Sequence, residues 1–448
     1  MSEQEPSDTS ARPGPLDRFL GLFSEVHAGE AGTAVVMLMS VFLLLVGYYV
    51  LKTVREPLVL VTGGAELKSY AAAGQALTLI FFVPLYSWLA SRVDRLKLIV
   101  FVLLFFFGCI EAFFVGGRMQ VPMLGFVFFI WVGIFSLVTI AQFWSYANDI
   151  YPKSVGDRLF PLIAIGQTGG SWAGSKVAEE LFKRRIDPFL MMQVAAALLL
   201  VHLGLYVWIN RRESGRGAAR KAEPPPVTGK NGFALVLESP YLRLIGALLI
   251  LLNAVNTLGE YILDRFVVAA AQAAVAADPT LTATSFIGEF KGGYFFYVNL
   301  VAVLLQAFVV SRLARYAGIA GVVLALPVVA LGTYGLAAVG AGIVLMRWVK
   351  TAENATDYSV MNTAKQMLWL PTTREQKYKA KQAVDTFFVR TGDLVAAGIV
   401  FLGTTMLGFG TRGFAVTNLA VTGLSLFVAW RLLREHARLT AEATPQAA

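Results

Sequence analysis

Charged residues are scarce in this chain. Asp, Glu, Lys and Arg make up 15% of its 448 residues, whereas hydrophobic residues make up 56%. Because soluble globular domains carry about 25% charged residues, the composition argues against an ordinary soluble protein. Apolar stretches of about twenty residues recur along the chain, the length that a helix needs to cross a bilayer core. The short alternating segments of a membrane β-barrel do not occur in the sequence, so an all-α membrane protein is predicted.

The residues that many enzymes and metal sites need are also rare. The one cysteine, Cys109, lies in an apolar run, which excludes an intrachain disulfide and a metal site built from several cysteines. There are three histidines and neither an HExxH nor a GxSxG pattern, so no enzyme is predicted. The Gly229–Lys230 pair lacks the upstream glycine of a Walker A loop. No cofactor, no metal and no ATP-driven pumping by this chain alone are expected.

Hydrophobic runs predict twelve transmembrane helices. They cover residues 32–52, 69–90, 98–117, 121–148, 159–181, 188–209, 241–263, 290–312, 317–338, 340–368, 382–409 and 412–433. A basic segment rich in Pro and Gly separates the sixth span from the seventh and is predicted to be a flexible linker. The predicted organisation is a cytoplasmic N-terminal tail (1–31), two six-helix halves (32–209 and 241–433) joined by the cytoplasmic linker (210–240), and a cytoplasmic C-terminal tail (434–448).

The chain is basic, with a net charge of +9. In a soluble protein this excess would suggest nucleic acid, but in a membrane protein Lys and Arg collect on the cytoplasmic side. With both termini cytoplasmic, most basic residues fall on that side, and Lys183–Arg185 is the main exception. The polar N-terminus has no secretory signal pattern, so the first span is expected to remain as an anchor. These features predict a multi-pass protein of a bacterial inner membrane with no nucleic-acid partner.

The two halves resemble each other weakly. The first span ends in LKTVREPL and the seventh in GEYILDRF, while the fourth runs into DIYPKSVGDRLFP and the tenth into WLPTTREQKYKAK. Two sets of six helices with a long cytoplasmic link are typical of the major facilitator fold, whose halves are parallel repeats. The loop SRVDRLK after the second span is similar to the basic–acidic gate loop of that fold. The predicted fold class is therefore a twelve-helix major facilitator fold.

Polar side chains recur at helical spacing inside several spans. A charged side chain at the bilayer centre costs about 2.5–3.5 kcal/mol, so such residues should face a cavity or one another. Charges near span ends are equally compatible with snorkelling or with salt bridges of a gate. In the eleventh span, Arg390 is predicted to point away from the shared face. The shared faces comprise Tyr48, Lys52 and Arg55; Thr139, Gln142, Ser145, Tyr146 and Asp149; Asn253, Asn256, Glu260 and Asp264; Lys350, Asn354, Asp357 and Lys365; and Lys381 with Asp385.

Glycine recurs every fourth residue in the fifth span. Gly166, Gly170 and Gly174 lie in the run GQTGGSWAG. A phosphate-binding loop is one interpretation, but close packing of this span against another helix is favoured, because small residues at this spacing let helix backbones approach.

Four segments resemble the nucleotide transporters, the ATP/ADP translocases of plastids and of obligate intracellular bacteria. They are LKTVREPLVLVTGGAELKSY, FWSYANDIYPKSVGDRLFPLIAIGQ, ESPYLRLIGALLILLNAVNTLGEYILDR and DYSVMNTAKQMLWLPTTREQKYKAKQAVD. The second is similar to the FW-x-x-AN signature, which includes Asn148, and the fourth to K-E-M-x-Y-I-P…K-x-K-A-A-x-D. The resemblance covers most of the chain, in the family's order, and implies exchange of nucleotides by alternating access.

The resemblance also implies four functional charges. Glu260 matches the acid of the seventh span, and Lys379 or Lys381 matches the lysine of the eleventh. Where the family has Lys-Asp after the first span, this chain has Arg55–Glu56, and Val132 stands where the family has an acid in the fourth span. Two of the four positions therefore depart from the family pattern, which bears on ATP/ADP specificity and leaves the fold and transport class intact.

The sequence as a whole predicts a secondary active transporter that exchanges nucleotides or a related phosphate-bearing anion in a lipid bilayer. A proton-coupled carrier of another organic anion, with Glu260 or Asp385 as the proton site, and a lipid or lipid-precursor flippase are the alternatives. Nothing in the sequence demands an oligomer. The predicted substrate-binding residues are Tyr48, Lys52, Arg55, Gln142, Asn148, Asp149, Asn253, Asn256, Glu260, Lys350, Asn354, Asp357, Lys379, Lys381 and Asp385.

Overall fold

The computed structural model describes residues 26–27, 29–90, 92–151, 153–214 and 231–443, which lie almost entirely in helices. The predicted flexible linker lies largely outside these residues, as do most of the N-terminal tail and the last five positions. The helices are α2 (Ala31–Ala90), α3 (Arg95–Arg118), α4 (Leu124–Ile150), α5 (Lys153–Lys183), α6 (Pro188–Ser214), α7 (Gly232–Glu238), α8 (Pro240–Ala277), α9 (Ala283–Phe308), α10 (Val310–Ala338), α11 (Ile343–Thr356), α12 (Asn362–Leu368), α13 (Lys381–Ala383), α14 (Val389–Thr405) and α15 (Thr411–Ala443).

Three short π-helical segments widen two of the C-terminal spans. Segment η1 (Asp357–Met361) joins α11 to α12, while η2 (Gln376–Ala380) and η3 (Val384–Phe388) flank α13. Such widened turns concentrate at functional sites, because the extra residue per turn re-aims the side chains beyond it. The tenth and eleventh predicted spans are therefore helical as expected, but not with a uniform 3.6-residue period.

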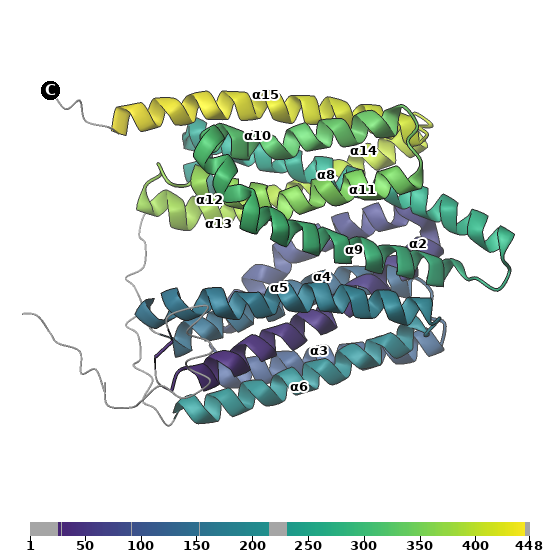
Figure 1. Cartoon of the computed structure of the whole chain (residues 1–448), viewed down its shortest axis with the longest axis horizontal. Helices are drawn as coiled ribbons and strands as arrows, with labels where there is room; N and C mark the ends of the chain where they lie inside the picture. The colour runs from purple at the N-terminus through teal and green to yellow at the C-terminus, as the bar shows by residue number, and fades with distance from the viewer. Residues whose placement is uncertain (1–25, 28, 91, 152, 215–230, 444–448) are drawn as a thin grey trace, which may run out of the picture.

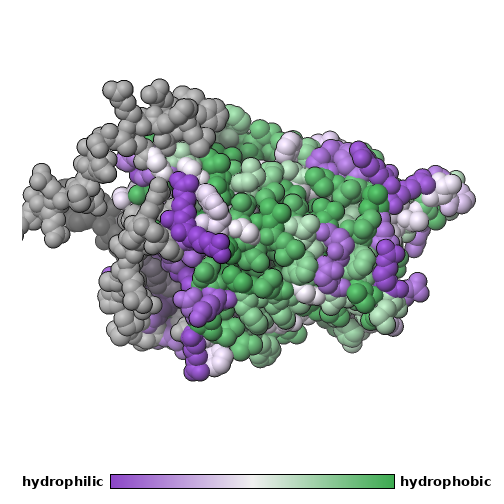
Figure 2. Space-filling model, turned by 90° about the horizontal axis from the view of Figure 1, so that it is seen from below, coloured by the Kyte–Doolittle hydropathy of each residue, from purple (hydrophilic) through white to green (hydrophobic). Residues whose placement is uncertain are grey.

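Nine helices in the described part of the chain are long and apolar enough to cross a membrane. The long α2 supplies two of the predicted spans, because Gly63 and Gly64 break its helical geometry and Gly64 takes a φ of +68°. Two further predicted spans, the fifth and the tenth, correspond to α5 and to the α11–α12 unit, which are not among these nine helices. With α2 counted twice, the arrangement is consistent with twelve spans. In Figure 2 a broad apolar band separates polar residues near the two ends of the molecule, as a bilayer requires.

Several helices continue beyond the ends predicted for their spans. The first span does not end at residue 52, because the helix continues to the turn at Gly63–Gly64, so Lys52 and Arg55 lie inside it. The seventh span reaches Ala277 instead of residue 263. The helix of the twelfth span runs on to Ala443, through most of the segment predicted to be a C-terminal tail. The helices extend because Lys, Arg, Glu and Ala form helices as readily as apolar residues do, so the end of a hydrophobic run does not end the helix.

The glycine repeat of α5 packs against the first part of α2. A Cβ added to Gly166 or Gly170 would lie 2.4 Å from the carbonyl oxygen of Leu38 or Phe42, respectively, and one at Gly174 would lie 2.7 Å from that of Val46. No real Cβ approaches a backbone atom so closely, so the two backbones touch along this line. The packing interpretation of the repeat is confirmed.

We expect Gly170→Ala to lower the free energy of unfolding by about 1–3 kcal/mol, the usual cost of overpacking a tight contact. The neighbouring Gly169→Ala is the matched control, because its Cβ would lie 3.6 Å from the Phe42 ring, an ordinary contact. Thermal unfolding of the purified variants in one detergent measures both. Equal stability of the two variants would contradict the close contact.

The helices form two groups that meet most closely at one end. Helices α2–α6 lie in one group and α8–α15 in the other, and the groups touch at the end away from the start of α2 and the end of α15 (Figure 1). At that end Arg185 donates hydrogen bonds to the backbone and side chain of Thr280, and Tyr261 donates to Glu66. Helices α5 and α9 also touch there, where Gly292 lies against the backbone of Glu179. We call this end of the molecule the closed end.

Candidate functional site

A cavity of about 250 Å³ lies between the two groups of helices. Its walls come from both parts of α2, from α4, α8 and α9, and from the widened eleventh and tenth spans. Four basic and four acidic side chains face it, together with amides and aromatic rings. The lining residues are Lys52, Arg55, Glu56, Ala65, Lys68, Ser69, Ala72, Phe129, Asn253, Asn256, Thr257, Glu260, Tyr261, Asp264, Phe295, Asn354, Tyr358, Arg390 and Asp393.

Lys52 is the basic residue of this cavity that has no acidic partner among the residues that the structure describes. Its side chain is largely buried, and no carboxylate in the described chain lies within 4.0 Å of its ammonium group. The ammonium instead lies 4.4 Å from the centre of the Phe295 ring and 4.9 Å from that of Tyr49. Aromatic faces stabilise a cation only in part. Lys52 therefore presents uncompensated positive charge to the cavity.

Two arginines face the same space from opposite helical groups. Arg55 lies 3.2 Å from Glu56 and stacks over the ring of Phe129 at 4.2 Å. Arg390 lies 3.4 Å from Asp393. Both guanidinium groups share carboxylates that have other donors, so each retains unused N–H groups that can bind the oxygens of an anion.

Between the cavity and the closed end, two lysines are surrounded by three carboxylates. Lys68 lies 2.5 Å from Glu56 and 2.7 Å from Asp264. Lys291 lies 2.5 Å from Asp264, 3.6 Å from Glu260 and 3.8 Å from Glu56. We call these five residues the gate cluster. Its members come from both helical groups, so the cluster binds the groups together electrostatically where they close.

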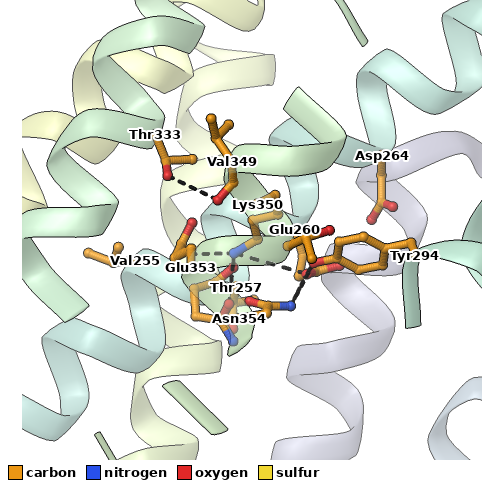
Figure 3. Close-up of polar contacts among 12 residues, drawn as sticks. Val255, Thr257, Glu260, Asp264, Tyr294, Thr333, Val349, Lys350, Glu353 and Asn354 are labelled. Carbon is orange, nitrogen blue, oxygen red and sulfur yellow. Dashed lines mark hydrogen bonds and ion pairs between the residues drawn. The ribbon is translucent and has the colours of Figure 1, made fainter. Parts of the chain in front are cut away.

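A second polar cluster lies behind the cavity wall, inside the C-terminal group (Figure 3). Lys350 is fully buried and lies 3.1 Å from Glu353, while the Tyr334 hydroxyl donates to the same carboxylate. The Lys350 ammonium also reaches the side-chain oxygen of Asn256 at 2.8 Å and lies 4.0 Å from Glu260. Lys350 is thus a neutralised lysine that does not line the cavity, which differs from its predicted position.

Three of the four predicted asparagines line the cavity, and each already forms a hydrogen bond with a charged side chain. Asn253 donates to Asp393 and to the Val389 carbonyl, and Asn354 donates to Glu260 and to Tyr294. The side-chain oxygen of Asn256 accepts from Lys350. These amides therefore fix the charged side chains in place. Glu260, as predicted, faces the cavity, where it accepts a hydrogen bond from Tyr294 at 2.9 Å.

The other predicted residues lie away from the central cavity. Asp149 pairs with Arg95 at the opposite end from the gate cluster, and Gln142 donates to Tyr86 beside a separate hollow. Asn148 donates to the Trp144 carbonyl, Lys381 donates to Gln366, and Asp385 is exposed. Asp357 forms an ion pair with Lys365, and Lys379 forms one with Glu375. None of these five predicted residues lines the central cavity. Tyr48 lines a neighbouring cavity. Val132 is fully buried in the core.

Sequence reasoning missed Lys68, Lys291, Arg390 and Tyr358. Lys68 fell in a predicted loop because the turn was placed too early in the chain. Arg390 was predicted to point away from Lys381 and Asp385, as it does, but their face was wrongly taken as the one that lines the cavity. A signal for Lys68 exists in hindsight: the pair Gly63–Gly64 is a stronger turn signal than the charged LKTVRE segment.

Sequence comparison supports the resemblance to nucleotide transporters. The chain is 24% identical over 299 residues to ADP,ATP carrier protein 1 of Chlamydia pneumoniae, covering 57% of this chain and 56% of that protein. It is 23% identical over 297 residues to the protein of the same name from Chlamydia trachomatis. The chain spans about half the length of the curated relatives that it matches. No protein-family model matches it.

Solved structures match over nearly the whole chain. The nucleoside transporter NupG superposes with a TM-score of 0.65 at 14% identity, covering 90% of this chain and 98% of that one. The chain has the major facilitator fold. A peptide transporter POT in complex with sulfate (TM-score 0.64, 11% identity, 92% and 95% coverage) and an inward-facing bacterial homologue of ferroportin (TM-score 0.64, 12% identity, 90% and 98% coverage) share it. The cavity of this transporter fold lies where the two helical groups meet.

Proposed function

We propose that this membrane transporter exchanges nucleotides, or a related phosphate-bearing anion, by alternating access. The observation that carries the proposal is Lys52, an unpaired cation at a cavity between the two helical groups. The sequence similarity to ADP,ATP carriers supports a nucleotide as the cargo. The fold alone does not identify the cargo, because the same fold occurs in transporters with different cargo.

The charge balance around the cavity favours an anion. Six basic side chains lie in or directly behind its walls, against five carboxylates. The carboxylates of Glu56, Glu260, Asp264 and Glu353 are neutralised by Lys68, Lys291 and Lys350 together with Arg55, so the surplus positive charge lies at Lys52. In a site of low dielectric constant, this surplus attracts an anion more strongly than it would in water. Phosphate oxygens can bind Lys52 and the free N–H groups of Arg55 and Arg390.

The two groups of helices would act as the moving halves. We propose that they correspond to residues 32–209 and 241–433, joined by the segment 210–240, and that the termini are cytoplasmic in a bacterial inner membrane. The closed end then faces outward and the structure represents an inward-facing state. When the gate cluster separates, its lysines and carboxylates become accessible from outside and the opposite end must close.

Exchange follows from the same charges. When the cavity is empty, Lys52 lacks a counter-charge, and closing both ends around it would desolvate a bare cation. A bound anion supplies the missing charge and removes this cost. We therefore propose that reorientation is rapid only with an anion bound, which makes net flux slow and counter-exchange fast.

A ligand screen tests the proposed function. The purified full-length chain is heated with ATP, ADP, other nucleotides, sugar phosphates and simple organic anions. A ligand that binds only the folded protein stabilises it by about 2.7 kcal/mol at 100 times its Kd. We expect nucleotides to raise Tm, and the shift to fall as salt increases, because the contacts are ionic. A screen in which only non-phosphate ligands raise Tm would refute the nucleotide proposal.

We expect Glu260→Gln to slow counter-exchange at least about tenfold without abolishing ligand binding. Glutamine has the size of glutamate and keeps an oxygen that accepts from Asn354 and Tyr294. It removes the negative charge shared by Lys68, Lys291 and Lys350, so the cavity would bind the anion too tightly for rapid exchange. Exchange of radiolabelled nucleotide in liposomes measures the effect. Glu289→Gln, the same change at an exposed position of α9, is the control. Unchanged exchange in Glu260→Gln would remove Glu260 from the mechanism.

A further inference from the structure

A second cavity, of about 440 Å³, lies beside the central one, between α2, α5 and α9. The two cavities meet at Tyr358, which lines both of them. Lys52 lies at the same junction, because its ammonium is 4.9 Å from the ring centre of Tyr49, which lines the second cavity, and 6.0 Å from that of Tyr358. A molecule with a phosphate group at Lys52 therefore has its remaining part next to the second cavity.

The lining of the second cavity differs in kind from that of the first. No Asp, Glu, Lys or Arg of the described chain lines it, whereas three tyrosines and several amides do. Tyr358 is 43% exposed, so part of its ring is free for contact. It projects from the π-helical segment η1, whose widened turn re-aims it toward both spaces. Rings and neutral amides suit a flat, uncharged, aromatic group with hydrogen-bonding edges.

Two glutamines of this cavity have amide groups to spare. The side-chain oxygen of Gln167 accepts from the Trp144 indole at 2.8 Å, which directs its NH₂ group elsewhere. Gln306 makes no hydrogen bond to any part of the chain that the structure describes, and its side chain is exposed beside the cavity. Free amides of this kind read nucleobases, because they both donate and accept. By contrast, each asparagine of the central cavity already binds a charged residue through one atom of its amide.

We propose that the second cavity is a nucleobase subsite, in which Tyr48 and Tyr358 contact the ring faces of the base and Gln167 and Gln306 contact its edge. This inference rests on the proposed function, since it places the uncharged part of the same substrate. The charged side chains of the central cavity would bind the phosphates, and the uncharged side chains of the second cavity would bind the base. Stacking on aromatic side chains binds every base, while the amides discriminate among bases.

The test compares ATP with inorganic tripolyphosphate, which keeps the anionic chain and lacks both the ribose and the base, so the tyrosine and glutamine variants must assign the difference to the base. Both are titrated against the purified full-length protein by calorimetry. We expect the wild type to bind ATP about 5- to 150-fold more tightly than tripolyphosphate, the range that base stacking supports. Tyr48→Leu and Tyr358→Leu should each lower this ratio toward one, with tripolyphosphate affinity changed less than about twofold in Tyr48→Leu. Gln306→Leu should alter the ratio of ATP to GTP affinity.

Two further variants guard against misfolding and indirect effects. Tyr48→Phe keeps the ring and should keep the wild-type ratio. Tyr297→Leu is the matched control, because Tyr297 lies on α9 but packs against Trp348 with ring centres 4.9 Å apart, outside both cavities. A wild-type ratio in both Tyr48→Leu and Tyr358→Leu, or equal affinities of the wild type for ATP and tripolyphosphate, overturns the subsite and leaves the phosphate site intact. If neither ligand binds the wild type, the proposed function fails, and the subsite fails with it.

Discussion

Lys52→Ala is expected to weaken the binding of an anionic substrate by about 10- to 150-fold. This is the loss of about 1.5–3 kcal/mol that accompanies removal of a hydrogen bond to a charged group. The ligand-free protein should be no less stable than the wild type, because Lys52 is a largely buried cation without an acidic partner. Replacing such a cation by alanine removes the free-energy cost of keeping an unpaired charge out of water in the folded protein. Opposite effects on binding and on stability distinguish a substrate-binding lysine from a structural one.

Two variants sharpen this experiment. Lys52→Arg retains the charge and should retain binding in part, since a guanidinium also binds phosphate but has a different geometry. Lys97→Ala makes the same change of charge at an exposed position near the start of α3 and should leave affinity unchanged. Calorimetric titration gives the affinities, and thermal unfolding without ligand gives the stabilities. Loss of stability in Lys52→Ala without loss of affinity would contradict the role of Lys52 in the proposed function.

Features that depend on the local sequence could be predicted, whereas features that depend on packing between helices could not. The membrane spans follow from local hydrophobicity, and the face of α8 that carries Asn253 and Glu260 follows from a regular helical period. Both cavity positions were found this way. In the eleventh span the helical period separated Arg390 from Lys381 and Asp385, but the cavity lies on the side of Arg390 and not on theirs. Which face of a helix meets the cavity is set by packing against other helices, so spacing alone does not identify it.

Partnership is a second property that spacing does not predict. Lys350 and Lys52 look alike in sequence, since both are lysines inside predicted polar faces. In the structure Lys350 is neutralised by Glu353, only three residues away, whereas Lys52 has aromatic neighbours instead. The Lys350–Glu353 pair is local, but the burial of Lys350 behind the cavity wall depends on contacts with Asn256 and Tyr334 on other helices. Lys68 and Lys291 were missed because both also pair with carboxylates on other helices, in addition to the Lys68–Glu56 pair within α2.

The largest effect on conformation is expected from Lys291→Met. Lys291 is fully buried, and its ammonium lies near three carboxylates, closest to Asp264 at 2.5 Å. Breaking a buried ion pair by removing one partner costs about 3–5 kcal/mol, because the other charge remains buried. The gate cluster joins the two helical groups only while this end is closed, so the lost free energy destabilises the closed state relative to the open one. We expect both a lower Tm and a shift toward the state in which this end is open.

Accessibility of the cavity from the closed end separates these two effects. Ser69 lines the cavity, so Ser69→Cys in a Cys109→Ala background supplies a thiol that a membrane-impermeant reagent added on the side of the closed end reaches only when that end opens. In vesicles, labelling from outside should rise in Lys291→Met. A cost of about 3–5 kcal/mol can change the ratio of the two states by more than about a hundredfold. Lys176→Met, which removes a half-exposed lysine paired with Glu179 and Glu180, should change labelling and Tm little.

A second substitution decides whether charge is the cause. Lys291→Met combined with Asp264→Asn removes one charge of each sign, and Lys68 then still has Glu56 at 2.5 Å. We expect the pair of changes to restore most of the lost stability and to reduce labelling again, because the uncompensated carboxylate is gone. A coupling energy of several kcal/mol between the two sites would identify the ion pair as the element that holds the end closed. Additive effects would instead assign the loss in Lys291→Met to packing around a buried side chain, and the gate cluster would then be a consequence of closure and not its cause.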